Sequence, residues 1–159
     1  MTRPPKYPLE ALGEVRARRV DAGAEEVARA IGAREAAELQ RARAEAARTR
    51  VEAEGERVRR TEKESLARGE LTAADLARGA AWEVAAREEA ARHREQLERA
   101  ASAAQAAYET EARAKEDLAA RKSEADVVEK DRAKWKARET KRVLDREEES
   151  AEEAWRRKA

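Results

Sequence analysis

The chain has 159 residues, with 36 Lys and Arg against 35 Asp and Glu, giving a net charge of +1. Charged residues make up 45% and aromatic residues 3%, whereas an ordinary globular domain carries roughly 25% charged residues. The few large aliphatic side chains contribute about 1.5–3 kcal/mol each when buried, which is too little to offset the ordering of a layered core. Composition therefore argues against a compact enzyme and leaves an extended helical chain or a disordered one.

Other classes of protein are also disfavoured. The longest apolar runs, such as residues 79–82, are far shorter than the ~18–20 residues of a membrane span. Residues 1–6 contain no apolar stretch, so we expect no secretory signal. The sequence has no Cys, which excludes disulfides and thiolate metal sites and fits a cytoplasmic protein. A net charge of +1 argues against nucleic-acid binding.

The proline and charge patterns favour ordered helix over disorder. No proline follows Pro8, and the remaining residues are mostly strong helix formers. Acidic residues precede basic ones by four positions at many places, as in Glu83/Arg87 and Glu95/Arg99. Such pairs stabilise a helix by about 0.2–0.5 kcal/mol each. Low hydrophobicity with high charge is also typical of disorder, but here the two signs alternate and nearly cancel.

The first predicted helix covers residues 9–68. Its candidate packing stripe has the three- and four-residue spacing of a coiled coil. The stripe comprises Leu9, Leu12, Ala17, Val20, Ala24, Val27, Ile31, Leu39, Ala42, Ala46, Ala53 and Val58.

A chain reversal is predicted at residues 69–72. Gly69 can adopt the left-handed conformation that ends a helix. Thr72 can cap the next helix, and Asp75 completes the pattern of a capping box. The alternative is one continuous helix with a soft point at Gly69.

The second predicted helix covers residues 73–157. Its stripe comprises Leu97, Ala101, Ala104, Tyr108, Leu118, Ala125, Val128 and Trp135. Pairing outward from a turn near residue 71 places Leu9 opposite Ala133, so the last ~25 residues extend beyond the first helix. The predicted fold is all-α: a single, long antiparallel two-helix coiled-coil hairpin over residues 1–159.

No pattern in the sequence indicates catalysis. The single His, His93, has no second His or Cys to complete a metal site. Neither nucleotide-binding glycine motif occurs, and a two-helix fold offers no pocket that would shift carboxylate pKa values. We therefore predict no enzyme activity, no cofactor and no metal. Trp135 and Trp155, near or beyond the end of the paired region, are candidate partner contacts; each could instead lie along its own helix under Arg and Lys stems.

Three segments resemble one known family. The opening Lys6-Tyr7-Pro8-Leu9-Glu10-Ala11-Leu12, the mid-chain segment 66–76 and the segment from Leu118 through Trp135 are similar to the YscO/FliJ family, the central-stalk proteins of type III secretion export ATPases. The likeness is greater to injectisome members, including the chlamydial type, than to flagellar ones.

This resemblance implies a hairpin that enters the pore of a hexameric export ATPase, promotes its activity and links it to the export-gate membrane protein. It also implies contact with secretion chaperones and a cytoplasmic location at the secretion apparatus, without membrane insertion. Tyr7, Leu9, Leu12 and the Trp135 region would then face the ATPase, and Trp155 would be a further partner contact. The chain would be a monomer in isolation.

Two other functions remain open from the sequence. One is a structural scaffold or peripheral-stalk-like subunit that dimerises through the Ala/Leu stripe. The other is a single-helix spacer stabilised by its four-residue charge pairs.

Overall fold

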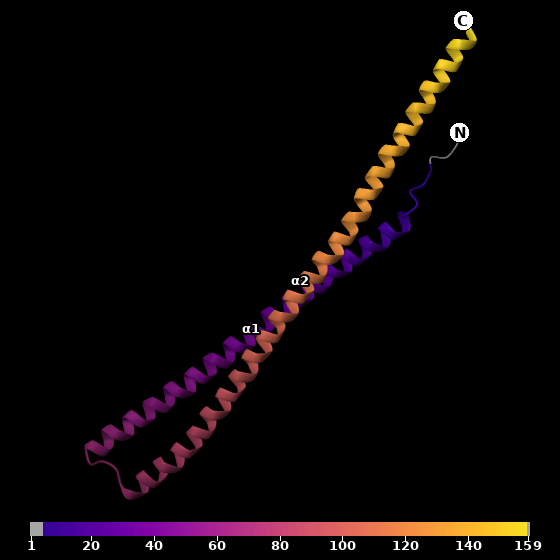
Figure 1. The fold of residues 1–159 in the computed structure, drawn as a ribbon. Helices are drawn as coiled ribbons and strands as arrows, with labels where there is room; N and C mark the ends of the chain where they lie inside the picture. Colours follow the sequence, from indigo (N-terminus) through magenta and orange to yellow (C-terminus); the bar gives the residue numbers. More distant parts are fainter. Residues whose placement is uncertain (1–4, 159) are drawn as a thin grey trace. The chain divides into compact units, whose positions relative to one another are not determined.

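The computed structural model describes residues 5–158 and consists of two helices, α1 (Glu10–Ala67) and α2 (Ala73–Lys158). They are joined by a short turn and run antiparallel, so the chain is an all-α helical hairpin (Figure 1). The helices begin and end within one residue of the predicted bounds, 9–68 and 73–157. No helix in the described part of the chain is long and apolar enough to cross a membrane.

The turn has the predicted stop and start signals. Gly69 has a φ of +70°, and the amides of Gly69 and Glu70 donate to the carbonyls of Leu66 and Ser65. This pair of hydrogen bonds is the Schellman motif that closes a helix C-terminus. At the start of α2, the Asp75 amide donates to the Thr72 hydroxyl (3.2 Å) and the Thr72 amide donates to the Asp75 carboxylate (2.9 Å). The capping box is therefore confirmed.

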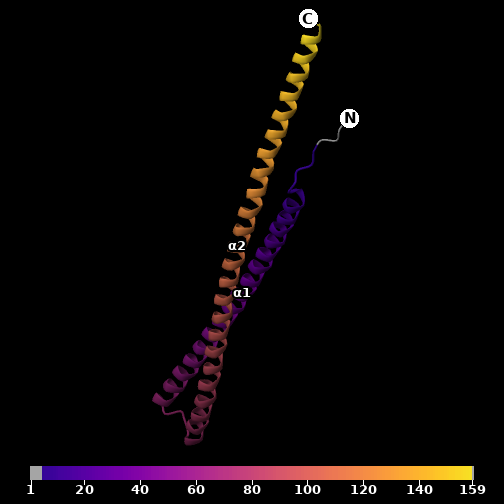
Figure 2. The same ribbon diagram turned by 45° about the vertical axis from the view of Figure 1, so that its right-hand side comes forward.

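The chain packs as two compact units. Among the described residues, the terminal unit contains 5–28 and 113–158, and the turn unit contains 29–112. In each unit a stretch of α1 lies against a stretch of α2 in the opposite direction, as Figures 1 and 2 both show. In the terminal unit, α2 continues past the N-terminal end of α1, as the pairing register predicts (Figure 1).

The inward positions of both helices recur every three or four residues, as in a coiled coil. On α1 they include Gly13, Arg16, Val20, Gly23, Val27, Ala30 and Arg34; on α2 they include Ala104, Ala107, Glu111, Ala114, Leu118, Arg121, Ala125, Val128, Arg132 and Trp135. We call these positions the seam.

The predicted stripe agrees with the seam at Val20, Val27, Ile31, Val58 and most α2 positions. It is wrong for Leu9, Leu12, Ala17, Ala24, Leu39, Ala42, Ala46, Ala53 and Tyr108, which are exposed. The reason is that Gly and Arg occupy inward positions of α1. A Cβ on Gly23 would lie 3.2 Å from the Leu118 side chain, so glycine gives α2 room to approach. The Arg stems cover apolar surface while their charged ends reach acidic groups.

Ion pairs across the seam connect the helices within each unit. In the turn unit, Arg34 donates through Nε to Glu111 at 2.5 Å, and Arg59 donates to Glu83 at 3.1 Å. Glu111 is only 7% exposed, and its hydrogen bond raises the Arg34 pKa above its ordinary value. Because a buried carboxylate is costly without a partner, this pair helps to set which α1 residue faces which α2 residue.

Candidate interaction site

The N-terminal segment continues from the start of α1 and packs against α2 in the terminal unit. Residues 5–9 are not helical, and Tyr7 is 6% exposed, among the most buried side chains described. The Tyr7 ring lies 5.6 Å from the Trp135 ring, centroid to centroid, with the two planes tilted by 58°. Tilted aromatic contacts of this kind contribute beyond the area they bury. The contact therefore fixes the chain just before α1 begins.

A hydrogen bond completes this contact. The Tyr7 hydroxyl donates to the Asp131 carboxylate at 2.7 Å. Burial of the phenol, followed by the hydrogen bond and negative charge of Asp131, raises the pKa of Tyr7 to about 12. The hydroxyl is thus held as a neutral donor.

The next turn of α1 is held to the same part of α2. Glu10 accepts a hydrogen bond from Arg132, which raises the Arg132 pKa above its ordinary value. Gly13 faces Val128, since a Cβ at Gly13 would lie 3.4 Å from the Val128 side chain. The start of α1 and residues 128–135 of α2 therefore form one packed structure, which we call the terminal clasp.

Apolar side chains remain exposed around the terminal clasp. Leu9, just before α1, is 43% exposed, and Leu12 and Val15 in the first turns of α1 are 40% and 47% exposed. On α2, Trp135, Thr140, Val143 and Leu144 line an open groove of about 410 Å³ together with Pro5, Lys136 and Glu139. Exposed apolar side chains gathered at one end of a chain are a candidate surface for contact with another protein.

The five predicted contact residues do not form a single surface. Tyr7 and Trp135 touch, whereas Leu9 and Leu12, just before and within the first turn of α1, are 43% and 40% exposed. The Tyr7 ring is buried against its own chain, so it stabilises the terminal clasp and has little surface left for a partner protein. Trp155 is 73% exposed and follows Trp135 by twenty residues of helix, about 30 Å.

Sequence reasoning missed Asp131 and the Glu10–Arg132 pair. The signal was available in the pairing register, because a turn near residue 71 places Tyr7 opposite Trp135 and Glu10 opposite Arg132. An acidic residue one helical turn from that Trp could therefore have been assigned to the Tyr hydroxyl.

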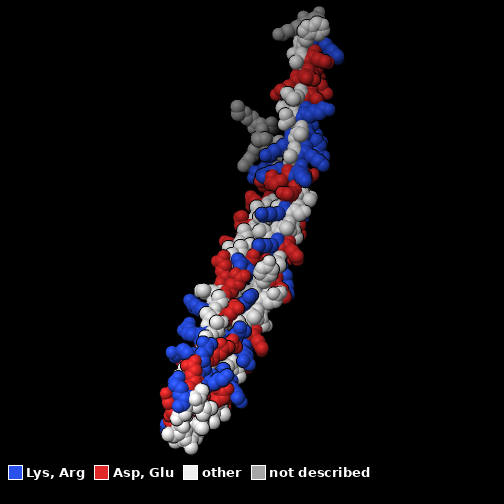
Figure 3. Space-filling view, turned by 90° about the vertical axis from the view of Figure 1, so that its left-hand side faces the viewer, with Lys and Arg blue, Asp and Glu red and all other residues white. Residues whose placement is uncertain are grey.

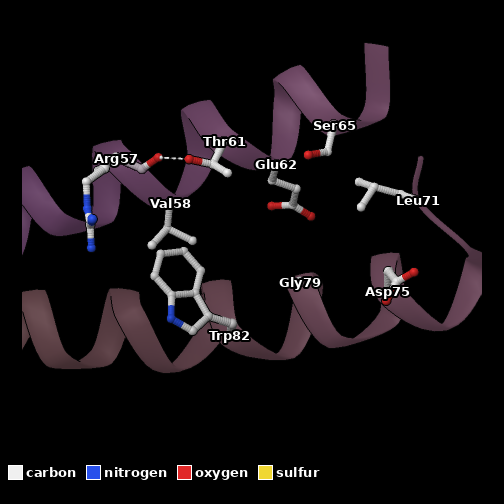
Figure 4. Close-up of a pocket in the computed structure, with 9 residues that line it drawn as sticks. All are labelled: Arg57, Val58, Thr61, Glu62, Ser65, Leu71, Asp75, Gly79 and Trp82. Atoms are coloured by element: carbon white, nitrogen blue, oxygen red, sulfur yellow. Dashed lines mark hydrogen bonds between the residues drawn. The ribbon is translucent and has the colours of Figure 1, made fainter. Parts of the chain in front are cut away.

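A second groove lies in the turn unit. It has a volume of about 470 Å³ and its lining includes Val58, Leu71 and Trp82. Figure 4 shows the Trp82 ring directed toward Val58, and Glu62 lying over Gly79. The Thr61 hydroxyl donates to the Arg57 carbonyl at 3.0 Å, so it is already satisfied within α1. The groove offers apolar surface near the turn.

Within residues 5–158, no group of three or more His, Cys, Asp and Glu side chains is arranged to hold a metal ion. His93 lies half-buried in the seam with Nε2 4.0 Å from Glu89 on its own helix. The described grooves are open, and their acidic and basic groups are largely paired.

Compared with known proteins, the chain matches no family model, no curated protein and no solved structure.

Proposed function

We propose that this chain is the central stalk of a type III protein secretion system, engaging the pore of a hexameric export ATPase and promoting its activity. The observation that supports the proposal best is the terminal clasp. Two of the three segments that resemble the stalk family, the opening Lys6–Leu12 and the stretch from Leu118 through Trp135, meet there through Tyr7 and Trp135. Segments that carry the likeness separately in the sequence thus belong to one structure.

The surface chemistry suits a stalk held in a ring. On the face shown in Figure 3, acidic and basic side chains are mixed along the chain up to the last part of α2. Each exposed ion pair stabilises a contact by only about 0.2–1 kcal/mol. Many such pairs can therefore orient the chain in the ATPase pore, while each single pair is easily broken and replaced by another. Leu9, Leu12 and Val15 would add the apolar contacts that fix one end of the chain against the ATPase.

The proposal extends to the other expected partners. The chain would link the ATPase to the export-gate membrane protein and meet secretion chaperones, acting in the cytoplasm at the secretion apparatus. It would act by contact, without catalytic residues or a cofactor of its own. Trp155 would supply a further contact beyond the terminal clasp.

The test is ATP hydrolysis by the cognate export ATPase with and without the purified chain. The wild-type chain should raise the hydrolysis rate, and Leu9→Asp combined with Leu12→Asp should abolish the increase. Leu39→Asp in the turn unit is the matched control, because Leu39 is similarly exposed at 51%. Circular dichroism should show equal helicity in all three proteins. A chain that neither binds nor stimulates the ATPase, or a double variant that stimulates normally, would contradict the proposal.

The alternative is a scaffold that dimerises through the Ala/Leu stripe. Ala104 and Val128 of that stripe are 6% and 4% exposed within the single chain. A dimer that used these α2 positions would have to open the hairpin, whereas exposed α1 positions of the stripe, such as Leu39 at 51%, are free to pair with the hairpin intact. Sedimentation of a parallel dimer with the mass of two chains would favour it.

A further inference from the structure

The final part of α2 carries separated blocks of charge. Residues 130–142 contain seven Lys and Arg against two Asp and Glu, whereas residues 143–153 contain six Asp and Glu against one Arg. In Figure 3 the two blocks appear as a blue group and then a red group toward the C-terminal end of α2. Every side chain of residues 141–157 is exposed, so the acidic block faces solvent, as do Lys134 and Lys141 of the basic block.

The same segment has an uncovered apolar face. Ala133, Ala137, Leu144, Ala151 and Trp155 are spaced by four or seven residues, so the helical period places them on one side of α2. This side is well away from the seam, where Trp135 contacts Tyr7. All five side chains are exposed, with Leu144 at 52% and Trp155 at 73%. Such a face gains stability by packing against a second helix.

The face is complementary to itself when two copies run antiparallel. With Leu144 opposite Leu144 of the second copy, Ala137 meets Ala151 of that copy, and Trp155 lies over the small residue Ala133. Alanine at these positions permits a close approach of the two helix axes, near the lower end of the usual 8–10 Å.

The charges select the same alignment. It places Lys134 beside Glu152 of the second copy and Lys141 beside Glu148, and twofold symmetry repeats each pair. Among the described residues, Lys134, Lys141 and Glu148 make no ion pair within their own chain. A parallel alignment would set basic blocks against each other, and an anionic polymer or membrane would be repelled by the acidic block. Opposite charges side by side therefore favour a second copy of this chain, running antiparallel.

We propose that residues 133–155 of α2 are a self-association site, through which two copies pair antiparallel around Leu144 while each hairpin stays intact. This proposal depends on the charge blocks and the apolar face, not on the proposed stalk function. An experiment can therefore contradict the self-association or the stalk function without contradicting the other. The contact is short and rich in alanine, so the dimer forms only as the chain concentration rises. A monomer would then be the form that engages the ATPase.

Disulfide cross-linking of the full chain tests the alignment, since the sequence contains no Cys. Leu144→Cys should oxidise to a covalent dimer several-fold faster than Arg146→Cys, which is exposed on a different side of the helix. Ala137→Cys alone should cross-link no faster than that control, but mixed with Ala151→Cys it should give a heterodimer. Equal rates for Leu144→Cys and Arg146→Cys would overturn the proposal. Efficient cross-linking of Ala137→Cys alone would show a parallel pair and would also overturn it.

Sedimentation of charge-reversed chains tests the role of the ion pairs. Lys134→Glu with Lys141→Glu, and separately Glu148→Lys with Glu152→Lys, should each abolish the dimer. Mixing the two variants should restore it as a heterodimer, because every pair is then attractive. The wild-type dimer should dissociate in about 1 M salt, where the Debye length is about 3 Å. Dimers of either variant alone, or no heterodimer in the mixture, would contradict the proposed pairs.

Discussion

The Tyr7 hydroxyl donates a hydrogen bond of 2.7 Å to the carboxylate of Asp131, although 124 positions separate the two residues in the sequence. This bond and the ring contact with Trp135 connect the N-terminal segment to the second helix. Ionised Tyr7 would lose its donor hydrogen and place a second negative charge beside Asp131. The terminal clasp should therefore weaken when Tyr7 ionises.

The pH dependence follows from the raised pKa of Tyr7, about 12. Because an unperturbed Tyr has a pKa of about 10, the docked neutral phenol contributes stability that is fully present below pH ~10 and lost as the pH rises through ~12. In Tyr108→Phe, which leaves Tyr7 as the single Tyr, the tyrosinate absorbance of the folded chain should have its midpoint near 12. Asp131→Asn should move the midpoint toward 10. A midpoint near 10 with Asp131 present would contradict the docked position of Tyr7.

Substitution of two glycines should have opposite effects on stability. Gly69→Ala forces an alanine into φ +70°, and we expect a loss of about 1–2 kcal/mol in the free energy of unfolding. Gly32 lies inside α1 with open space around its missing Cβ, so Gly32→Ala should gain about 0.5–1 kcal/mol. Urea unfolding followed by circular dichroism measures both. Equal effects of the two substitutions would mean that Gly69 does not end α1 in the left-handed conformation.

Gly23→Ala should gain less than Gly32→Ala, although both glycines lie within α1. A Cβ at Gly23 would approach the Arg121 and Leu118 side chains to 3.1 and 3.2 Å, and that crowding offsets the improved helix propensity. The same urea measurement compares the two variants. A gain at Gly23 as large as at Gly32 would show that α2 does not pack closely there.

Removal of the α2 cap should destabilise the hairpin. Thr72→Ala deletes the hydroxyl that accepts from the Asp75 amide, and we expect a cost of about 1 kcal/mol. Thr110→Ala is the matched control, because the Thr110 hydroxyl only donates to the Ala106 carbonyl inside α2. Since alanine has the higher helix propensity, this control should be neutral or slightly stabilising. Equal losses in the two variants would argue against the cap.

The cross-helix pair Arg34–Glu111 should matter more than the neighbouring exposed pair on α1. Glu111→Gln leaves Arg34 without its nearest carboxylate in the seam, whereas Glu38→Gln removes a solvent-exposed partner 2.8 Å from Arg34. Thermal unfolding should therefore show the larger decrease in melting temperature for Glu111→Gln. A larger decrease for Glu38→Gln would mean that the pair within α1 stabilises the chain more than the pair between α1 and α2, which would contradict this prediction.

The helix bounds and the turn could be predicted because their signals are local. Gly69 and the Thr72–Asp75 pair each act within a few residues, and no proline interrupts either helix. The pairing register then followed from the position of the turn.

The inward face of α1 could not be predicted from hydrophobicity. Gly13, Gly23, Arg16 and Arg34 occupy seam positions, while Leu9 and Leu12 point outward. Glycine contributes no apolar side chain, and an Arg stem contributes apolar surface that a hydrophobicity pattern does not register. The inward face of α1 is decided by how α1 packs against α2. Part of that packing is the contact of Arg34 with Glu111 and of Tyr7 with Asp131, and only the pairing of the two helices brings these residues close.

A designed disulfide tests whether the start of α1 pairs with residues 128–135 of α2 in one chain. Gly13→Cys with Val128→Cys should oxidise rapidly to an intramolecular disulfide, because a Cβ at Gly13 lies 3.4 Å from the Val128 side chain. Gly13→Cys with Val127→Cys is the control, since Val127 is 61% exposed. Rapid cross-linking of the first pair within a monomer, and not of the second, is the predicted result. Equal rates for both pairs, or cross-links only between chains, would contradict the hairpin.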